Sequence, residues 1–234
     1  MNFCDNPRIL IFGFSHAAIE IAHALKQTHH SFKIIDNEPN LLQKAHALHL
    51  ELSLLDYSDE ELLMEEGVGN GVEFIFALFE EDAKNVFLTL CAKSIDPQVH
   101  IVAITHTKDA IHKLEIAGAS TILDPYQISG KKIYKLITQP EVMNVIDATI
   151  FGKHSISMEQ ITITDHSLIN QQMIHAIFPM ATYNVLLIGI HDKELAKPFI
   201  FITEGHNHKL DAGDILVVIG EDNEIERFKK DFLL

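Results

Sequence analysis

The chain has 234 residues, 47% apolar and 22% charged, a composition typical of a folded globular protein and not of a disordered or fibrous one. It carries 18 basic and 33 acidic side chains, and a formal net charge of −15 argues against a nucleic acid partner. The only cysteines, Cys4 and Cys91, exclude a disulfide framework and a cysteine zinc site and favour a reducing compartment. The sequence has neither a membrane-spanning apolar run nor a signal-peptide pattern.

The first half of the chain alternates short aliphatic runs with amphipathic stretches. The aliphatic runs are continuous, which indicates that both faces of their sheet are covered. Repeated strand–helix units predict an α/β fold, a Rossmann-like doubly wound parallel sheet with right-handed crossovers. The predicted strands are 8–13, 32–36, 50–55, 74–78, 100–104 and 120–123, and the helices between them include 17–26, 39–48, 82–93 and 108–116.

The pattern changes after Asp124-Pro125. Two helices are predicted on either side of Pro140, and their exposed-looking apolar residues predict a helical dimerisation arm. From about residue 155 the pattern becomes mostly β, with a closing helix at 221–232, which indicates a small α+β lobe. The expected domains are a Rossmann-like N-terminal lobe (1–125), the arm (126–150) and a C-terminal lobe (151–234).

The first strand is followed by Gly13-Phe14-Ser15-His16-Ala17-Ala18, which partly matches a dinucleotide-binding turn. Only the first of three fingerprint glycines is kept, although Ser15 and Ala18 are small enough to leave the backbone amides facing an anion. Asp36 lies 23 positions after Gly13, at the end of the second strand, where an acid would meet ribose hydroxyls.

Asp56, after the third strand, lines the same crevice in one interpretation and caps the following helix in the other. The expected ligand is an adenine nucleotide or NAD(H), and the alternative is a Rossmann-like fold that has lost its nucleotide. The candidate cofactor-binding residues are Gly13, Phe14, Ser15, His16, Asp36 and Asp56.

Several segments, in the right order over nearly the whole chain, resemble the regulator of potassium conductance (RCK) domain. They are residues 9–15, 117–119 and 124–130, together with 210–216 and 224–228, which resemble the C-terminal lobe of the same proteins. The resemblance implies a homodimer formed through the arm and the C-terminal lobe. It also implies that N-terminal lobes assemble dimers into a larger ring. Ligand binding would change the shape of this ring and so act on a pore, with nothing catalysed.

The glycine-poor first turn resembles that of the cytosolic gating domain of ligand-gated potassium channels more than that of transporter subunits. Peripheral subunits of Trk/Ktr-type potassium transporters usually keep all three glycines and follow them with an arginine, and here His16 stands at that position. We therefore expect a cytoplasmic gating-ring domain at the inner face of the membrane, attached through a pore-forming partner or a transmembrane segment outside this sequence. The transporter subunit is the alternative. A second alternative, an NAD-dependent oxidoreductase, is disfavoured by the degenerate phosphate turn.

The same resemblance points to a divalent-cation position after the fourth and fifth strands. In calcium-gated members, the carboxylate that opens the helix after the fourth strand matches Asp82. The two acids expected at the end of the fifth strand are replaced by Ile104 and His106. Calcium needs six or more oxygen ligands, so the classical calcium site is incomplete. Asp82 with His106 could instead bind a transition metal; the alternative is a helix cap beside a strand-end histidine.

Overall fold

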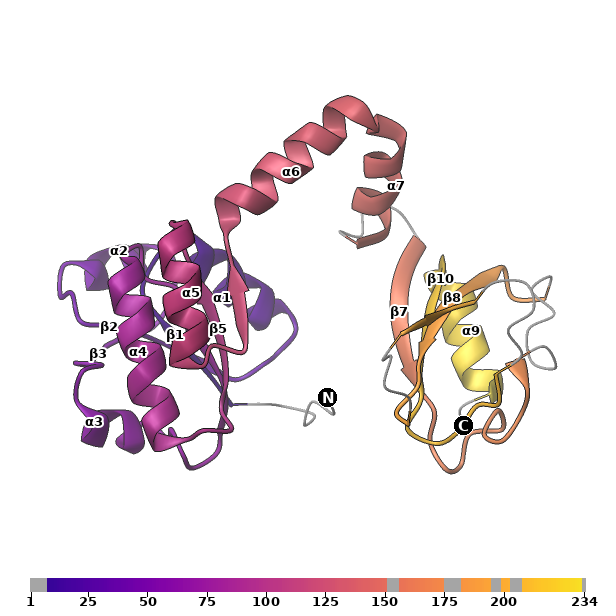
Figure 1. Ribbon diagram of the computed structural model, residues 1–234, viewed down its shortest axis with the longest axis horizontal. Helices are drawn as coiled ribbons and strands as arrows, with labels where there is room; N and C mark the ends of the chain where they lie inside the picture. The colour runs from indigo at the N-terminus through magenta and orange to yellow at the C-terminus, as the bar shows by residue number, and fades with distance from the viewer. Residues whose placement is uncertain (1–7, 151–155, 175–181, 195–198, 203–207, 233–234) are drawn as a thin grey trace. The chain divides into compact units, whose positions relative to one another are not determined.

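A computed structural model describes residues 8–150, 156–174, 182–194, 199–202 and 208–232 (Figure 1). Its internal contacts divide the chain into two compact units, Met1–Ile133 and Tyr134–Leu234. Cys4 and residues 151–155, where the C-terminal lobe is expected to begin, lie outside the described residues. The three domains expected from the sequence, and the two boundaries between them, stay a prediction.

The first unit contains one parallel sheet of six strands in the order β3-β2-β1-β4-β5-β6. β1 pairs with β2 on one side and with β4 on the other, so the strand order reverses direction at β1. The predicted Rossmann-like doubly wound sheet is confirmed. The strands are β1 (Arg8–Phe12), β2 (Phe32–Asp36), β3 (Leu52–Leu54), β4 (Val72–Ala77), β5 (His100–Ile104) and β6 (Thr121–Leu123).

The helices of this unit begin and end where local hydrogen bonding favours it. The Ser15 and Thr107 hydroxyls cap α1 and α5, and the Asp59 carboxylate accepts two amide hydrogen bonds at the start of α3. Gly118 ends α5 in the left-handed region, with φ of 95°. The helices are α1 (His16–Gln27), α2 (Leu41–Ala47), α3 (Glu60–Glu65), α4 (Asp82–Ile95) and α5 (Lys108–Ala117).

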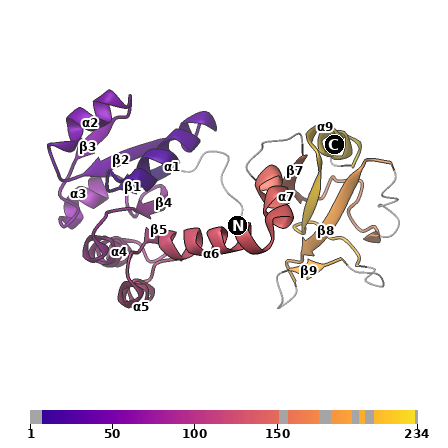
Figure 2. The ribbon, with the colours of Figure 1, turned by 90° about the horizontal axis from the view of Figure 1, so that it is seen from above.

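Helices cover the sheet from both sides, as the continuous aliphatic strands require. α1 packs on one face through the buried Ala18 and Ala22, whereas α4 and α5 pack on the other through Leu88, Ala92 and Leu114 (Figure 2). The small residues of α1 allow its axis to approach the strands closely. This packing fixes the carboxyl ends of β1, β2, β4 and β5 at one edge of the sheet.

Two helices follow the sheet, α6 (Pro125–Thr138) and α7 (Pro140–Ile150). The break at Pro140 is confirmed, and the proline is the first residue of α7, where its missing N–H costs nothing. α6 buries none of its residues, and Ile133, Leu136 and Ile137 are all exposed. α6 therefore carries an apolar stripe that has no partner among the described residues.

The second unit ends in an antiparallel sheet of order β7-β10-β8-β9. α9 packs on this sheet through the buried Ile225 and Phe228, and the predicted small α+β lobe is confirmed (Figure 1). Among the helices that the structure describes, none is both long and apolar enough to cross a membrane. The elements are β7 (Ile156–Thr162), β8 (Val185–His191), β9 (Ile200–Phe201), β10 (Ile215–Glu221) and α9 (Asp222–Phe232).

Candidate functional site

A crevice of about 260 Å³ opens at the carboxyl ends of β1, β2 and β4. This is the point where the strand order reverses, and ligands of open α/β sheets bind at such points. The structure brings Gly13, Phe14, Ser15 and Asp36 together here, as their places in the sequence predicted. His16 and Asp56 are not among the lining residues. The remaining lining residues are Glu38, Leu41, Lys44, Phe79, Glu80, Glu81 and Lys84.

Gly13 is required by the backbone of the turn. Its φ is 92°, and a Cβ at this position would lie 2.6 Å from the backbone nitrogen of Phe79 and 2.8 Å from the carbonyl carbon of Leu78. No side chain fits between the turn and the segment that follows β4. The one glycine kept from the fingerprint is therefore the one that lets the turn pass close to β4.

Ser15 and His16 begin α1, but only Ser15 faces the crevice. The Ser15 Oγ accepts a hydrogen bond from the amide of Ala18 at 3.3 Å, and the residue is buried. The first turn of α1 contains no acidic residue, so the positive end of the helix dipole is not neutralised by a side chain of that turn. His16 is exposed and is not one of the residues that line the crevice. This end of the crevice suits an anion.

The Asp36 carboxylate is buried and already accepts three backbone hydrogen bonds. Oδ2 accepts from the amide of Phe14 at 2.8 Å, and Oδ1 accepts from the amides of Asn37 at 2.7 Å and Glu38 at 3.1 Å. A carboxylate offers about four lone-pair positions. Asp36 therefore holds the turn after β1 against the segment after β2 and has little capacity left for ribose hydroxyls.

Asp56 lies outside the crevice and makes a local turn. Its Oδ1 accepts hydrogen bonds from the Ser58 hydroxyl at 2.6 Å and the Ser58 amide at 3.0 Å, and these bonds lower the pKa of the Asp56 carboxyl. The helix cap at this point is Asp59. Asp56 is exposed and its carboxylate is used by the turn, which favours the structural interpretation of this residue.

Sequence reasoning missed the two lysines of the crevice. Lys84 Nζ lies 2.9 Å from Glu81 Oε1, 3.6 Å from Glu38 Oε1 and 5.9 Å from the centroid of the Phe79 ring. The hydrogen bond to Glu81 raises the pKa of Lys84, so its ammonium stays charged. Lys44, on α2, is exposed. The position of Lys84, in the first turn of the helix after β4, was the available signal, because parallel strands place such turns at one sheet edge.

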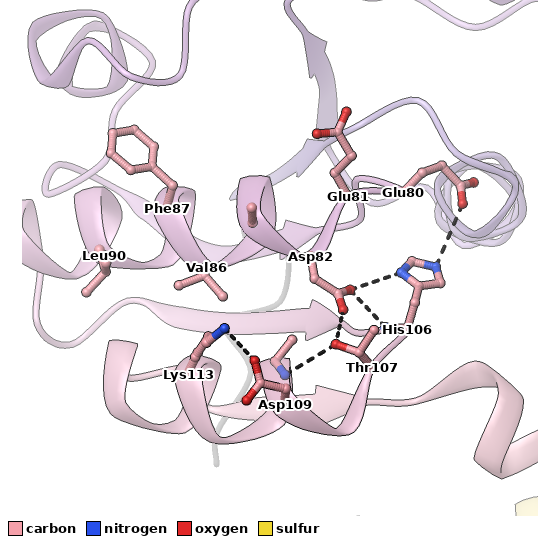
Figure 3. A pocket seen from close by; sticks show the side chains of 12 residues that line it. Glu80, Glu81, Asp82, Val86, Phe87, Leu90, His106, Thr107, Asp109 and Lys113 are labelled. Carbon is pink, nitrogen blue, oxygen red and sulfur yellow. Dashed lines mark hydrogen bonds and ion pairs between the residues drawn. The ribbon is translucent and has the colours of Figure 1, made fainter.

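Asp82 and His106 meet at the ends of β4 and β5 (Figure 3). Asp82 Oδ1 lies 3.1 Å from the His106 Nδ1 and accepts a hydrogen bond from the His106 amide at 2.8 Å. Asp82 Oδ2 accepts from the Thr107 hydroxyl at 2.7 Å. Burial acts to raise the pKa of Asp82, but the hydrogen bonds from Thr107 and His106 outweigh it and hold the pKa below its ordinary value.

The predicted metal pair is thus adjacent, but its carboxylate is engaged by protein donors. His106 Nε2 also lies 3.7 Å from Glu80 Oε2, and its ring centroid is 5.8 Å from that of Tyr126 at the start of α6. Within the described ranges, no group of three or more His, Cys, Asp or Glu residues is arranged to hold a metal ion. The expected helix cap is not seen, since the N-cap of α4 is Glu81 and no side chain caps the helix there. Asp82 instead joins His106 and Thr107, and the His106 ring links this edge of the sheet to Tyr126 of α6.

A second and larger hollow, of about 700 Å³, begins at the same carboxylates and runs between α4 and α5 (Figure 3). We call it the α4–α5 groove. Val86, Phe87 and Leu90 of α4 line its apolar part, and Phe87 and Leu90 are 44% and 50% exposed. Its polar part contains Asp82 and the Asp109–Lys113 ion pair. Two large apolar side chains this exposed on one face of α4 are typical of a protein contact surface.

The fold is a Rossmann-like domain with a crevice at its strand-order reversal, followed by a small α+β lobe. Residues 9–125 match the family model of the TrkA-N domain, and residues 158–233 match that of the TrkA-C domain. The chain therefore belongs to the family of proteins that combine TrkA-N and TrkA-C domains.

Two curated relatives are potassium channel proteins of Methanocaldococcus jannaschii. Potassium channel protein 1 is 24% identical over 230 residues, covering 96% of this chain and 66% of the relative. Probable potassium channel protein 2 is 35% identical over 95 residues, covering 41% of this chain and 27% of the relative. The chain thus spans about two thirds or less of the length of these relatives.

Solved structures share the fold. The crystal structure of the GsuK RCK domain matches with a TM-score of 0.50 and 18% identity over 97% of this chain and 46% of that one. The GsuK channel bound to NAD matches with a TM-score of 0.52 and 16% identity, over 98% of this chain and 39% of that one. The TrkA-N domain of the inner membrane protein ybaL from Escherichia coli matches with a TM-score of 0.50 and 12% identity, over 58% of this chain and 98% of that one. The resemblance to RCK domains is confirmed.

Proposed function

We propose that this chain is the regulatory domain of a potassium channel, in which a ligand-dependent change in a ring of such domains controls the pore. The observation that carries the proposal is the similarity to potassium channel protein 1 of M. jannaschii, which runs through both domains and covers 96% of this chain. The chain's own role is binding without catalysis. A ligand opens the pore only to the extent that it binds one ring shape more tightly than the other.

Two surfaces support assembly into a ring. The apolar stripe of α6, with Ile133 58% and Ile137 77% exposed, suits a dimer contact through the arm. The α4–α5 groove suits a contact between N-terminal lobes of neighbouring dimers. The acidic end of this groove holds Asp82 and His106, and the His106 ring lies beside Tyr126 in the first turn of α6. A contact at this end of the groove would therefore lie close to α6.

The ligand proposed for the crevice is an adenine nucleotide, and the GsuK channel bound to NAD is the precedent for such a ligand in this fold. The residues fit the phosphate end of a nucleotide, since Ser15, the start of α1 and two lysines surround it. They fit the ribose end less well, because Asp36 is engaged by backbone amides. The crevice is also somewhat smaller than the roughly 300–1,000 Å³ usual for ligand pockets.

The transition-metal hypothesis for Asp82 and His106 stays a prediction. Zinc or nickel would raise the melting temperature of the wild-type chain, because a ligand that binds only the folded state stabilises it. Replacing His106 with alanine would remove the increase. An equal increase in both proteins would assign the metal to another place.

A peripheral subunit of a Trk-type transporter is the second candidate, favoured by the TrkA-N and TrkA-C matches. Potassium uptake and conductance distinguish the two. A channel regulator changes the conductance of a pore with which it co-purifies, when NAD or ADP is added. A transporter subunit, expressed with its membrane subunit, instead restores saturable potassium uptake to cells that lack potassium transporters of their own. Turnover of a nicotinamide cofactor with a small substrate would contradict both and support an oxidoreductase.

A further inference from the structure

We infer that Lys84 is a ligand-responsive clasp of the crevice. Without ligand, its ammonium joins Glu38 and Glu81; with a nucleotide bound, it leaves Glu38 and pairs with the phosphate. This inference deepens the proposed function and rests on the crevice being a nucleotide site.

The position of Lys84 follows from the strand order. β2 and β4 flank β1 on opposite sides, so a residue after β2 and a residue after β4 stand on opposite sides of the turn that follows β1. Glu38 follows β2 and Lys84 lies in the first turn of the helix after β4, and both line the crevice. Their ion pair of 3.6 Å therefore passes over the end of β1, where a bound phosphate would face α1.

The charges around the crevice make this ion pair competitive with a ligand. Four acids line it, Asp36, Glu38, Glu80 and Glu81, against the two lysines. Asp36 is compensated by three amides, but Glu38 and Glu81 are compensated by Lys84 itself. A phosphate entering this acidic surrounding needs a cation. Glu38 and the phosphate therefore compete for one ammonium.

The degenerate phosphate turn increases this need. In the full fingerprint, glycines let backbone amides approach the pyrophosphate closely. Here the third and sixth positions are Ser15 and Ala18, and the Ser15 hydroxyl is used to cap α1. Side-chain cations must supply what the backbone does not. The Phe79 ring, 5.9 Å from the Lys84 Nζ, supports the lysine beside the crevice.

Isothermal titration of the assembled protein with ADP tests the inference, with AMP and NAD as further probes. Lys84→Met should weaken ADP binding about tenfold, the value of one charge-assisted hydrogen bond. Glu38→Gln should tighten it about two- to fivefold, because the lysine is freed from a half-exposed ion pair. In the double variant the gain from Glu38→Gln should disappear, which a merely structural role of Lys84 does not predict.

The Lys33–Glu66 pair supplies matched controls. It is a second lysine–glutamate pair in the same unit, 2.5 Å apart, and neither residue lines the crevice. Lys33→Met and Glu66→Gln should leave the ADP affinity unchanged. Equal ADP affinity of Lys84→Met and wild type would overturn the clasp and leave nucleotide binding intact. If the wild type binds none of the three probes, the clasp and the nucleotide ligand are both wrong, whereas ring assembly and channel control remain to be judged by their own measurements.

Discussion

Asp82, the first residue of α4, is joined at two points to His106, two residues beyond β5: its Oδ1 accepts a hydrogen bond from the His106 amide at 2.8 Å and lies 3.1 Å from the ring Nδ1. The same carboxylate accepts from the Thr107 hydroxyl that caps α5. One partly buried side chain thus ties the starts of α4 and α5 together at the end of the α4–α5 groove.

This relationship predicts a pH dependence of stability. Because the pKa of Asp82 is lower in the folded chain than its ordinary 3.8, the carboxylate stabilises the fold fully above pH 3.8 and loses this effect as the pH falls through the lower folded-state value. Asp82→Asn should lower the free energy of unfolding at pH 7 by roughly 1 kcal/mol. The difference from wild type should shrink in acid, as measured by urea denaturation at pH 7 and pH 3.

Asp109→Asn is the control for this measurement, because Asp109 is 80% exposed and pairs only with Lys113 of the same helix among the contacts described. It should change stability little at either pH. A pH-independent difference between Asp82→Asn and wild type would contradict the role assigned to the carboxylate.

The α6 stripe predicts the dimer contact. Ile133→Asp or Leu136→Asp should convert dimers to monomers, because an unpaired charge would be forced into an apolar interface. The first unit should stay folded by circular dichroism, since α6 buries no residue. Gln127→Asp, on the polar stripe where Gln127 bonds to Lys131, is the control and should sediment as wild type. Unchanged sedimentation of both apolar variants would show that the arm is misassigned.

The α4–α5 groove predicts a different contact. Leu90→Asp should leave dimers intact but prevent their assembly into a larger ring, because Leu90 is a half-exposed lining residue of the groove. The comparable change Met64→Asp alters a half-exposed apolar residue on α3, away from the groove, and should have no effect on assembly. Light scattering after size-exclusion chromatography separates the two. If Leu90→Asp formed rings of the same mass as the wild type, the α4–α5 groove would not be the contact between dimers.

The C-terminal lobe contains a histidine between two buried carboxylates. His208 Nε2 lies 3.5 Å from Asp214 Oδ2 and 3.6 Å from Asp192 Oδ2, and both acids are buried. His208→Leu should destabilise the lobe by on the order of 3 kcal/mol, because it leaves the two carboxylates facing an apolar group. His166→Leu, at an exposed position of the same lobe, should change the urea midpoint little. Identical urea midpoints for His208→Leu and the wild type would mean that His208 does not compensate these two acids.

The fold was predictable because its signals are local. Continuous aliphatic runs gave the buried parallel strands, and Pro140 gave the break between α6 and α7. The start of α2 was less accurate, because Pro39 occupies a turn and the helix begins at Leu41. The residue at which a helix begins depends on hydrogen bonds in the preceding turn, and the spacing of apolar residues does not predict these bonds.

The crevice was predictable in position but not in chemistry. Gly13, Phe14, Ser15 and Asp36 meet as expected, because strand ends of a parallel sheet share one edge. That Asp36 is consumed by three amides depends on how the turns fold over it, and spacing along the chain does not report this. Lys84 reaches Glu38 across 46 positions, a pairing that only the tertiary structure reveals.

Potassium conductance, recorded in planar bilayers from this chain together with the pore that it is proposed to regulate, tests nucleotide control of that pore most directly. The account predicts that ADP or NAD changes the open probability of the wild type. It also predicts that Lys84→Met shifts this response to higher nucleotide concentration. A potassium-selective current of normal amplitude whose open probability ignores both nucleotides, or the absence of any current with purified and correctly assembled protein, would contradict it.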